Sequence, residues 1–600
     1  MRLFSLSEIT GKAQNAIKRF PVTLVWAICG TLFCIVVVND GSRDLFDDYS
    51  AVFLTLVLGI SWLIGMQFLL EQTARPKKWI WLKAVILLLL FAFYWHLPDS
   101  FRIENEPEYL LRFFLYGIAG HLFVLFAPFL FNWNKEAYWN YLKSIGTAIL
   151  RSGFFSGVLF LGLVLALVAI DALFDAKIDG KRYGQLFIFC LGIVNTWIYL
   201  SDFPKSIQQD TTIIFNKALE VFVKYILIPL VLLYLAILYA YGGKILLEWE
   251  LPKGWVSYLV TALALLGFVV QIIINPVQKT MKSWTIRVFH PFFYILLLPL
   301  VALLFVAIYR RVSDYGITEN RYFVIVLAFW ILGMALYLLL AKNRRLILLP
   351  FSLFLIALLT SFGYWSAVSV SLRSQFGQFQ NVLESVKANE NVSSPEQHEQ
   401  LRSILEYMYN RRALSKLDPI TNMAMEETFV DTTDGKLYGY RWFNTRRVLD
   451  SLGISIDPEA LNPDGEYGIP YNYFDNEYAM EQSYRIGDFD YFMPLQLNRY
   501  TEKTISLGSI SAQYDNSRNT LIFIESIDST EVFELSLREK LLELTKFNSQ
   551  LPKEAYDQLT LNFKNERILG KLIFKDLSYN IKNDSISLDH SRAYLFLKLR

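Results

Sequence analysis

The sequence predicts a membrane all-α helical bundle of about 11 transmembrane helices, followed by a soluble α+β C-terminal domain. Two observations predict this fold class. Hydrophobic residues make up 54% of the 600 residues, and they gather in long apolar runs that end near residue 370. The charge changes at the same place: residues 371–600 hold 26 Lys and Arg against 34 Asp and Glu, which leaves 31 against 21 for residues 1–370.

The apolar runs match the roughly 20 residues that a helix needs to cross the hydrocarbon layer of a bilayer. Eleven spans are predicted, at 20–38, 51–70, 79–95, 110–131, 145–170, 183–200, 223–241, 255–274, 289–309, 322–340 and 346–365. Ahead of them, Leu6, Ile9, Ala13 and Ile17 repeat at helical spacing, which predicts an interfacial helix on the membrane surface. We therefore divide the chain into an interfacial helix (1–19), a polytopic domain (20–370) and an outer domain (371–600).

The positions of Lys and Arg predict the orientation, because cytoplasmic connections carry an excess of these residues. The N-terminal segment and the even-numbered connections hold about 18 cations, and the odd-numbered connections hold about 10. The N-terminus is therefore expected in the cytoplasm. An odd number of spans then places the C-terminal domain outside, in the periplasm of a Gram-negative cell, and the chain in its inner membrane.

Three polar residues inside the predicted spans are candidates for function, because polar groups within a membrane are costly. These are His121, Asn195 and Gln271. His121 follows Gly117 and Gly120, which favours a hydrogen bond between closely packed helices. A role in proton or substrate transfer is the alternative.

The seam, which we define as residues 361–386, carries the chain from the last span into the polar C-terminal third. Phe379, Val382, Leu383 and Val386 show helical spacing, so the seam is predicted to continue as a surface helix that holds the outer domain against the membrane. The seam contains a Gly-x-Trp step and a serine-rich stretch. Their residues are Gly363, Trp365, Ser369, Val370, Ser371, Ser374 and Gln375.

These seam residues resemble the corresponding stretch of an uncharacterised bacterial membrane family catalogued as domain of unknown function 4153. The beginning of the chain, "LFSLSEITGKAQNAIKRFPVTL", is similar to that family as well. The resemblance implies several spans followed by an outer domain. It implies no activity and no site.

The outer domain is predicted to begin with helices and to end with strands. "SSPEQHEQLRSILEYMYNRRALSKL" has an N-cap at Ser394 and one apolar face, and "FNTRRVLDSLGI" is a second short helix. "TISLGSISAQYDNSRNTLIFIES" reads as a hairpin, "LSLREKLLELTKF" as a helix, and "KLIFKDLSYN" and "SRAYLFLKL" as strands.

Composition and motifs leave the molecular activity open. The acidic C-terminal third disfavours nucleic-acid binding, and the chain has no P-loop, nucleophile elbow, zinc pair or dinucleotide fingerprint, so we expect no cofactor. We favour a non-enzymatic anchor for a periplasmic interaction domain in envelope assembly or signalling. Its expected partners are the lipid bilayer and an envelope protein or a lipid-linked glycan.

Two alternatives remain open. The first is a membrane glycosyltransferase or lipid-linked transferase. Its candidate residues are Asp44, Asp47 and Asp48 in the acidic first outer loop, where carboxylates can hold a divalent metal or act as a base. The second is a transporter, for which His121 is the candidate.

Overall fold

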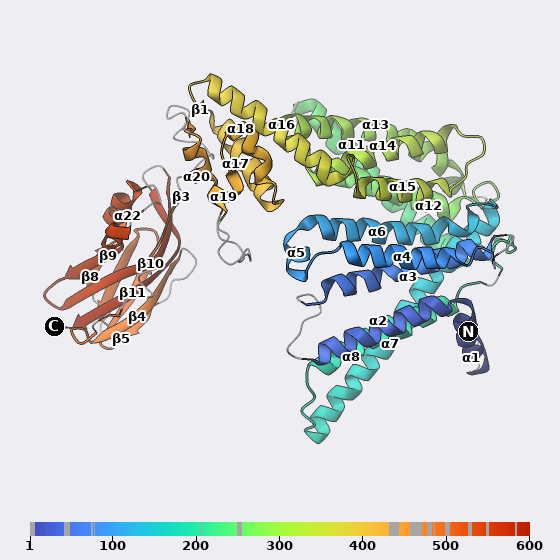
Figure 1. Cartoon of the computed structure of the whole chain (residues 1–600), viewed down its shortest axis with the longest axis horizontal. Helices are drawn as coiled ribbons and strands as arrows, with labels where there is room; N and C mark the ends of the chain where they lie inside the picture. Colours follow the sequence, from blue (N-terminus) through green and yellow to red (C-terminus); the bar gives the residue numbers. More distant parts are fainter. Residues whose placement is uncertain are drawn as a thin grey trace. The chain divides into compact units, whose positions relative to one another are not determined.

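The protein is represented by a computed structural model of the whole chain (Figure 1). The structure describes residues 6–40, 48–73, 76, 78–204, 206–248, 255–281, 283–430, 443–456, 471–476, 483–484, 486–498, 504–525, 531–547, 551, 553–582 and 585–599. The chain forms two compact units. The first comprises Met1–Ser385 and Gln400–Leu452, and the second comprises Val386–Glu399 and Gly453–Arg600.

Long apolar helices dominate the first unit. Among the described residues, nine helical segments are long and apolar enough to cross a membrane. They are α2 (Pro21–Asn39), α3 (Ser50–Glu71), α6 (Pro107–Phe126), α7 (Lys135–Phe174), the run from α8 (Lys181–Phe189) through η2 (Cys190–Asn195) to α9 (Thr196–Ser201), the run from α10 (Lys217–Phe222) through η3 (Val223–Leu227) to α11 (Ile228–Glu248), α12 (Trp255–Ile274), α13 (Trp284–Tyr315) and α14 (Glu319–Leu340).

The two remaining predicted spans coincide with shorter apolar helices, α4 (Leu82–His96) and α15 (Leu348–Ser361). Residues 79–81 form turns rather than the first turn of α4, which shortens that helix. At the end of α15, Gly363 takes φ +78°, a conformation that a helix does not use. The predicted interfacial helix is α1 (Leu6–Arg19).

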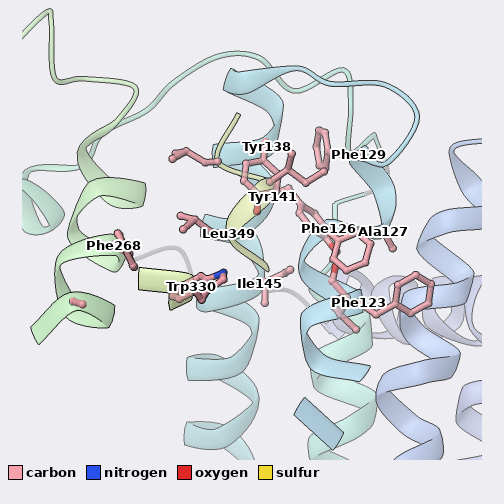
Figure 2. Packing of buried hydrophobic residues seen from close by; sticks show 14 of the residues in the cluster. Phe123, Phe126, Ala127, Phe129, Tyr138, Tyr141, Ile145, Phe268, Trp330 and Leu349 are labelled. Carbon is pink, nitrogen blue, oxygen red and sulfur yellow. The ribbon is translucent and has the colours of Figure 1, made fainter. Parts of the chain in front are cut away.

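Aromatic side chains form much of the core between the helices. The ring of Phe126 lies edge-on to Phe351 and Phe354 of α15, with centroids 5.2 Å apart in each pair. Phe129 packs in the same way on Tyr138, which is fully buried. Figure 2 shows Phe126, Phe129 and Tyr138 gathered among the helices that carry them. This packing joins α6 and its 3₁₀ extension to α7 and α15.

Beyond the last apolar helix, the chain continues with five further helices among the described residues. They are α16 (Ala367–Ala388), α17 (Pro395–Asn410), α18 (Asp418–Thr421), α19 (Met425–Phe429) and α20 (Thr445–Ser451). α16 extends three residues past the first unit, and α17 begins five residues before it resumes. The helices predicted for the seam, for 393–417 and for "FNTRRVLDSLGI" are confirmed, the second ending at Asn410 and followed by a 3₁₀ turn.

The second unit contains two antiparallel sheets. One has the order β3–β10–β11–β4, with β9 paired to β10, and the other has the order β5–β6–β7–β8. The strands are β3 (Tyr471–Asp475), β4 (Tyr491–Asn498), β5 (Ile505–Leu507), β6 (Ile510–Asp515), β7 (Thr520–Glu525), β8 (Glu531–Ser536), β9 (Thr560–Lys564), β10 (Ile568–Lys582) and β11 (Ser585–Leu599). The predicted hairpin is β6–β7, and the two predicted closing strands are β10 and β11. The α+β class is thus confirmed.

Side chains alternate between the two faces of the β3–β10–β11–β4 sheet. On β11, Leu595 and Leu597 are buried in the main core beneath the sheet, as period-2 alternation requires. Tyr594 and Phe596 point to the other face, where they meet Phe492 of β4 with ring centroids 5.6 and 5.0 Å away. This second face carries its own small aromatic cluster.

The close approach of α12 to α13 generates a test of the bundle. A Cβ at Gly267 would overlap the ring of Phe293, which is 1% exposed and stacked on Phe289. We expect Gly267→Ala to destabilise the protein by about 1–3 kcal/mol, because the buried ring has little room to move. The measurement is thermal unfolding in detergent. Gly333→Ala on α14 is the matched control, since its Cβ would meet no atom within 4 Å. Equal melting temperatures would contradict the packing.

Candidate functional site

A buried carboxylate joins the bundle to the helices that follow it. Glu319, the first residue of α14, is only 6% exposed. Its Oε1 accepts hydrogen bonds from Arg411 Nε at 2.8 Å and from the Tyr407 hydroxyl at 2.9 Å. Tyr407 and Arg411 are four residues apart, so both reach from the same side of the chain at the end of α17. Burial and the neighbouring Glu319 raise the pKa of Tyr407, which keeps its hydroxyl protonated as a donor.

A second set of contacts ties the seam to the connection between α13 and α14. Gln375 Nε2 donates to the carbonyl oxygens of Tyr315 and Ile317, at 2.9 and 3.1 Å. The Ile317 amide donates to Ser374 Oγ at 2.8 Å. Gly316 has φ +67°, and a Cβ there would lie 2.9 Å from Gln375 Nε2. The two seam side chains thus satisfy backbone groups at the end of α13, which a helix cannot satisfy within itself.

A third contact joins the end of α17 to the start of α6. Arg412 Nη1 donates to Glu106 Oε1 at 2.8 Å, and Arg102 Nε donates to the same oxygen at 2.8 Å. We call the contacts of Glu319, Gln375, Ser374 and Glu106 the junction. The junction ties α16 and α17 to three separate points of the bundle.

The other seam residues have simpler surroundings. The carbonyl oxygen of Trp365 accepts a hydrogen bond from the Tyr322 hydroxyl, while the Trp365 side chain is 67% exposed. Ser369 Oγ accepts from Ser366 Oγ at 2.9 Å. Ser371 is fully buried, and within the described part of the chain its hydroxyl has no hydrogen-bond partner. A Cβ at Gly363 would meet no atom within 4 Å.

Two of the three intramembrane candidates line one cavity. This cavity, which we call the groove, lies among α2, α3, α6, α7 and the run from α8 to α9, and it has a volume of about 1110 Å³. His121 and Asn195 both line it. The His121 Nδ1 lies 2.8 Å from the carbonyl oxygen of Gly117 in its own helix, whereas Asn195 Oδ1 accepts from Ser156 Oγ of α7 at 3.4 Å.

Gln271 lies elsewhere, buried on α12. Its Nε2 donates to Gln278 Oε1 at 3.2 Å, and its own Oε1 has no partner in the described part of the chain. Of the acidic candidates, Asp44 and Asp47 lie outside the described residues. Asp48 is described and exposed, two residues before α3 begins. Within the described ranges, His, Cys, Asp and Glu side chains form no group of three that could hold a metal ion.

Several polar residues were not among the sequence candidates. Glu319 and Glu106 lie at the starts of apolar helices. Acidic residues are common there, so the sequence around these two residues does not indicate a functional role. His290 is buried on α13, where its Nε2 lies 2.9 Å from the Leu338 carbonyl oxygen and its ring packs against Tyr294. His290 is the second residue of the predicted span 289–309, and an ionisable residue at a span end is not remarkable by itself.

Comparison with known proteins finds one family. The family model described as "Domain of unknown function (DUF4153)" matches residues 24–381, which cover the apolar helices and most of the seam. The chain is 26% identical over 351 residues to an uncharacterized protein from Pasteurella multocida (strain Pm70), a match that covers 57% of this chain and 55% of that protein. The chain thus spans just over half the length of this curated relative. No solved structure matches the chain.

The junction generates a test by charge removal. We expect Arg411→Ala to destabilise the protein by about 3–5 kcal/mol, because it leaves the buried Glu319 carboxylate without its cation. Thermal unfolding measures the loss, and hydrogen exchange should show faster exchange of the α17 amides.

The matched control for this test is Arg310→Ala, which removes an exposed pair with Asp314 at 3.7 Å. Such a pair contributes only about 0–1 kcal/mol. If the two substitutions cost the same, Glu319 and Arg411 do not form a buried pair.

Proposed function

The chain belongs to the DUF4153 family, and we propose that it is an inner-membrane protein that anchors a periplasmic interaction domain in envelope assembly or signalling. The apolar helices indicate a multi-pass membrane protein. The excess of Lys and Arg in the N-terminal segment and in the even-numbered connections supports a cytoplasmic N-terminus. The number of crossings is odd for the nine long helices and also with α4 and α15 included, which supports an outside C-terminus.

The observation that carries the anchoring role is the contact of Glu319 with Arg411 and Tyr407. A buried ion pair adds little net stability. It nevertheless favours one arrangement strongly, because separating the partners leaves a buried charge without a partner. This contact joins the bundle to two residues that lie 88 and 92 positions further along the chain. A protein that holds its post-bundle helices in one fixed arrangement needs contacts of this kind.

The second unit supports an interaction role through its aromatic face. Phe492 is 51% exposed and Ile486 is 58% exposed, and Phe492 packs on Tyr594 and Phe596. Exposed aromatic side chains that pack on well-ordered neighbours are typical of protein-binding surfaces. The transferase and transporter alternatives remain predictions. Of the three acidic candidates, only Asp48 is described; it is exposed, and within the described ranges it belongs to no group of three residues that could hold a metal ion.

The proposed topology predicts the result of reporter fusions. Alkaline phosphatase fused after Arg600 should be active and green fluorescent protein at the same point should be dark, because only the phosphatase folds in the periplasm. The same reporters fused at the N-terminus are the control and should behave in the opposite way. Fluorescence from the C-terminal fusion would overturn the periplasmic placement.

Complementation separates anchoring from transferase chemistry. In a strain that lacks the protein, envelope integrity is measured as sensitivity to detergent. The triple variant Asp44→Asn, Asp47→Asn, Asp48→Asn should restore integrity as well as the wild type does, since anchoring needs none of these carboxylates. Arg411→Ala should restore it poorly at matched protein level. Loss of complementation by the triple variant, with normal membrane content, would favour the transferase.

A further inference from the structure

The groove has room for a ligand, and its walls suit hydrocarbon. Its volume of about 1110 Å³ exceeds the roughly 300–1,000 Å³ of typical small-molecule sites. Its walls come from helical segments that are long enough to cross a membrane, and most of the side chains on them are apolar. Gly153 and Gly157 of α7 line the groove, and a Cβ at either position would meet no atom within 4 Å. Hydrocarbon chains of the surrounding bilayer therefore suit this space better than water does.

No acidic or basic side chain lines the groove in the described part of the chain: its walls hold no Asp, Glu, Lys or Arg. An ionised group of a ligand would find no counter-ion among these residues. A charge without a counter-ion is costly inside a membrane bundle. The walls thus favour an uncharged ligand.

His121 provides the groove with a hydrogen-bond acceptor. Its Nδ1 lies 2.8 Å from the carbonyl oxygen of Gly117, which can only accept, so Nδ1 carries the proton of the neutral ring. The Nε2 of this tautomer is an acceptor, and no described residue hydrogen-bonds it. The His121 side chain is exposed and lies on the groove wall, so it can accept a hydrogen bond from a hydroxyl group of a ligand.

Asn195 provides the groove with hydrogen-bond donors. Its Oδ1 accepts from Ser156 Oγ, while no described residue hydrogen-bonds the two N–H groups of its side-chain amide. Asn195 is the last residue of the π-helical turn η2, and such turns occur frequently at functional sites. This turn packs closely on α2, since a Cβ at Gly192 would overlap the side chain of Thr31. The amide N–H groups suit a carbonyl oxygen of a ligand.

Both polar side chains lie well inside the ends of their helices. His121 is five residues before Phe126, the end of α6, and Asn195 is six residues before Ser201, the end of α9. At 1.5 Å per residue these separations are roughly 8 and 9 Å. Polar groups at this depth are costly when they face hydrocarbon alone, so they indicate a ligand with hydrogen-bonding groups of its own.

We propose that the groove binds a diacylglycerol, an uncharged membrane lipid with one hydroxyl group and two ester carbonyl groups. The apolar walls take its hydrocarbon chains. Its hydroxyl group donates to His121 Nε2, and an ester carbonyl oxygen accepts from the side-chain amide of Asn195. This binding does not depend on the anchoring function, so either can fail without the other.

Capping the hydroxyl group tests the contact with His121. The probe is diacylglycerol with a photoreactive group in one acyl chain, added to the full-length protein in phosphatidylcholine nanodiscs, and the readout is labelling of peptides from α2, α6 and α7. A second probe carries a methyl ether in place of the hydroxyl group. We expect the wild type to label about fivefold more with the alcohol, the ratio that one net hydrogen bond gives. His121→Phe should remove this preference and leave labelling by the ether unchanged, because it keeps a ring in the wall but no acceptor.

The matched control for the hydroxyl test is His96→Phe, which replaces an exposed histidine outside the groove. This variant should keep the full preference. Equal labelling of the wild type by both probes would overturn the proposal. So would a His121→Phe variant that retains the preference.

A charged probe tests the exclusion of ionised groups. Photoreactive phosphatidic acid has the same chains and carries a phosphate in place of the hydroxyl group. We expect it to label the same peptides about tenfold less than diacylglycerol does, because its charge would be buried without a counter-ion. Labelling by phosphatidic acid that equals labelling by diacylglycerol would contradict the choice of an uncharged lipid.

Filling the groove tests the place of binding. The variant Gly153→Leu, Gly157→Leu should fold, because both positions face open space, and it should lower labelling by diacylglycerol about tenfold. Gly162→Leu, further along α7, is the matched control, since Gly162 is exposed and outside the groove. If the filled variant labels as strongly as this control, the lipid contacts only the outer surface of the bundle and the proposal fails.

Discussion

The arrangement of the first unit depends on the desolvated carboxylate of Glu319. A buried charge is tolerated only where a partner of opposite charge and further hydrogen bonds compensate for the lost water. Tyr407 of α17 and Arg411, which directly follows that helix, provide this compensation. The carboxylate therefore selects one position for α17. The side-chain amide of Gln375 makes an independent tie nearby, because it donates to the carbonyl oxygen of Tyr315, the last residue of α13, and to that of Ile317. Because the ties use different chemistry, ionic in one case and neutral in the other, they respond differently to salt and to charge substitutions.

The layout of the fold could be predicted from the sequence because membranes restrict the choice of structure. In hydrocarbon every backbone group needs an internal partner, so a long apolar run can only be a helix or part of a closed barrel. Each of the eleven predicted spans coincides with an apolar helix among the described residues, including α4 and α15, which are shorter than the rest. The strands at the end of the chain could also be predicted, because their apolar residues alternate between the two faces of the sheet. Leu595 and Phe596 accordingly lie on opposite faces. Strand order was not readable, because the pairing of β3 and β4 on either side of the β10–β11 hairpin depends on contacts between distant residues.

The candidate site was only partly predictable, since its contacts join residues far apart in the chain. The seam was singled out by its residues, and two of them, Ser374 and Gln375, prove to bind the connection after α13. Their partners could not be named in advance, because a serine-rich stretch does not specify which carbonyl group it will meet. Glu319 and Arg411 were missed for the same reason. Each is locally ordinary, an acidic residue at a helix start and a cation after a helix end, and only the fold makes them a pair.

One helix, α6, contributes to both the junction and the groove. Near the start of α6, Glu106 binds Arg412 and so holds the end of α17. Four turns later His121 lines the groove, and Val124 and Leu125 line it after that. A 20-residue helix is a stiff rod of about 30 Å, so its two ends cannot shift independently. The position of Glu106 in the junction and the wall that His121 provides to the groove are therefore set by the same stiff helix.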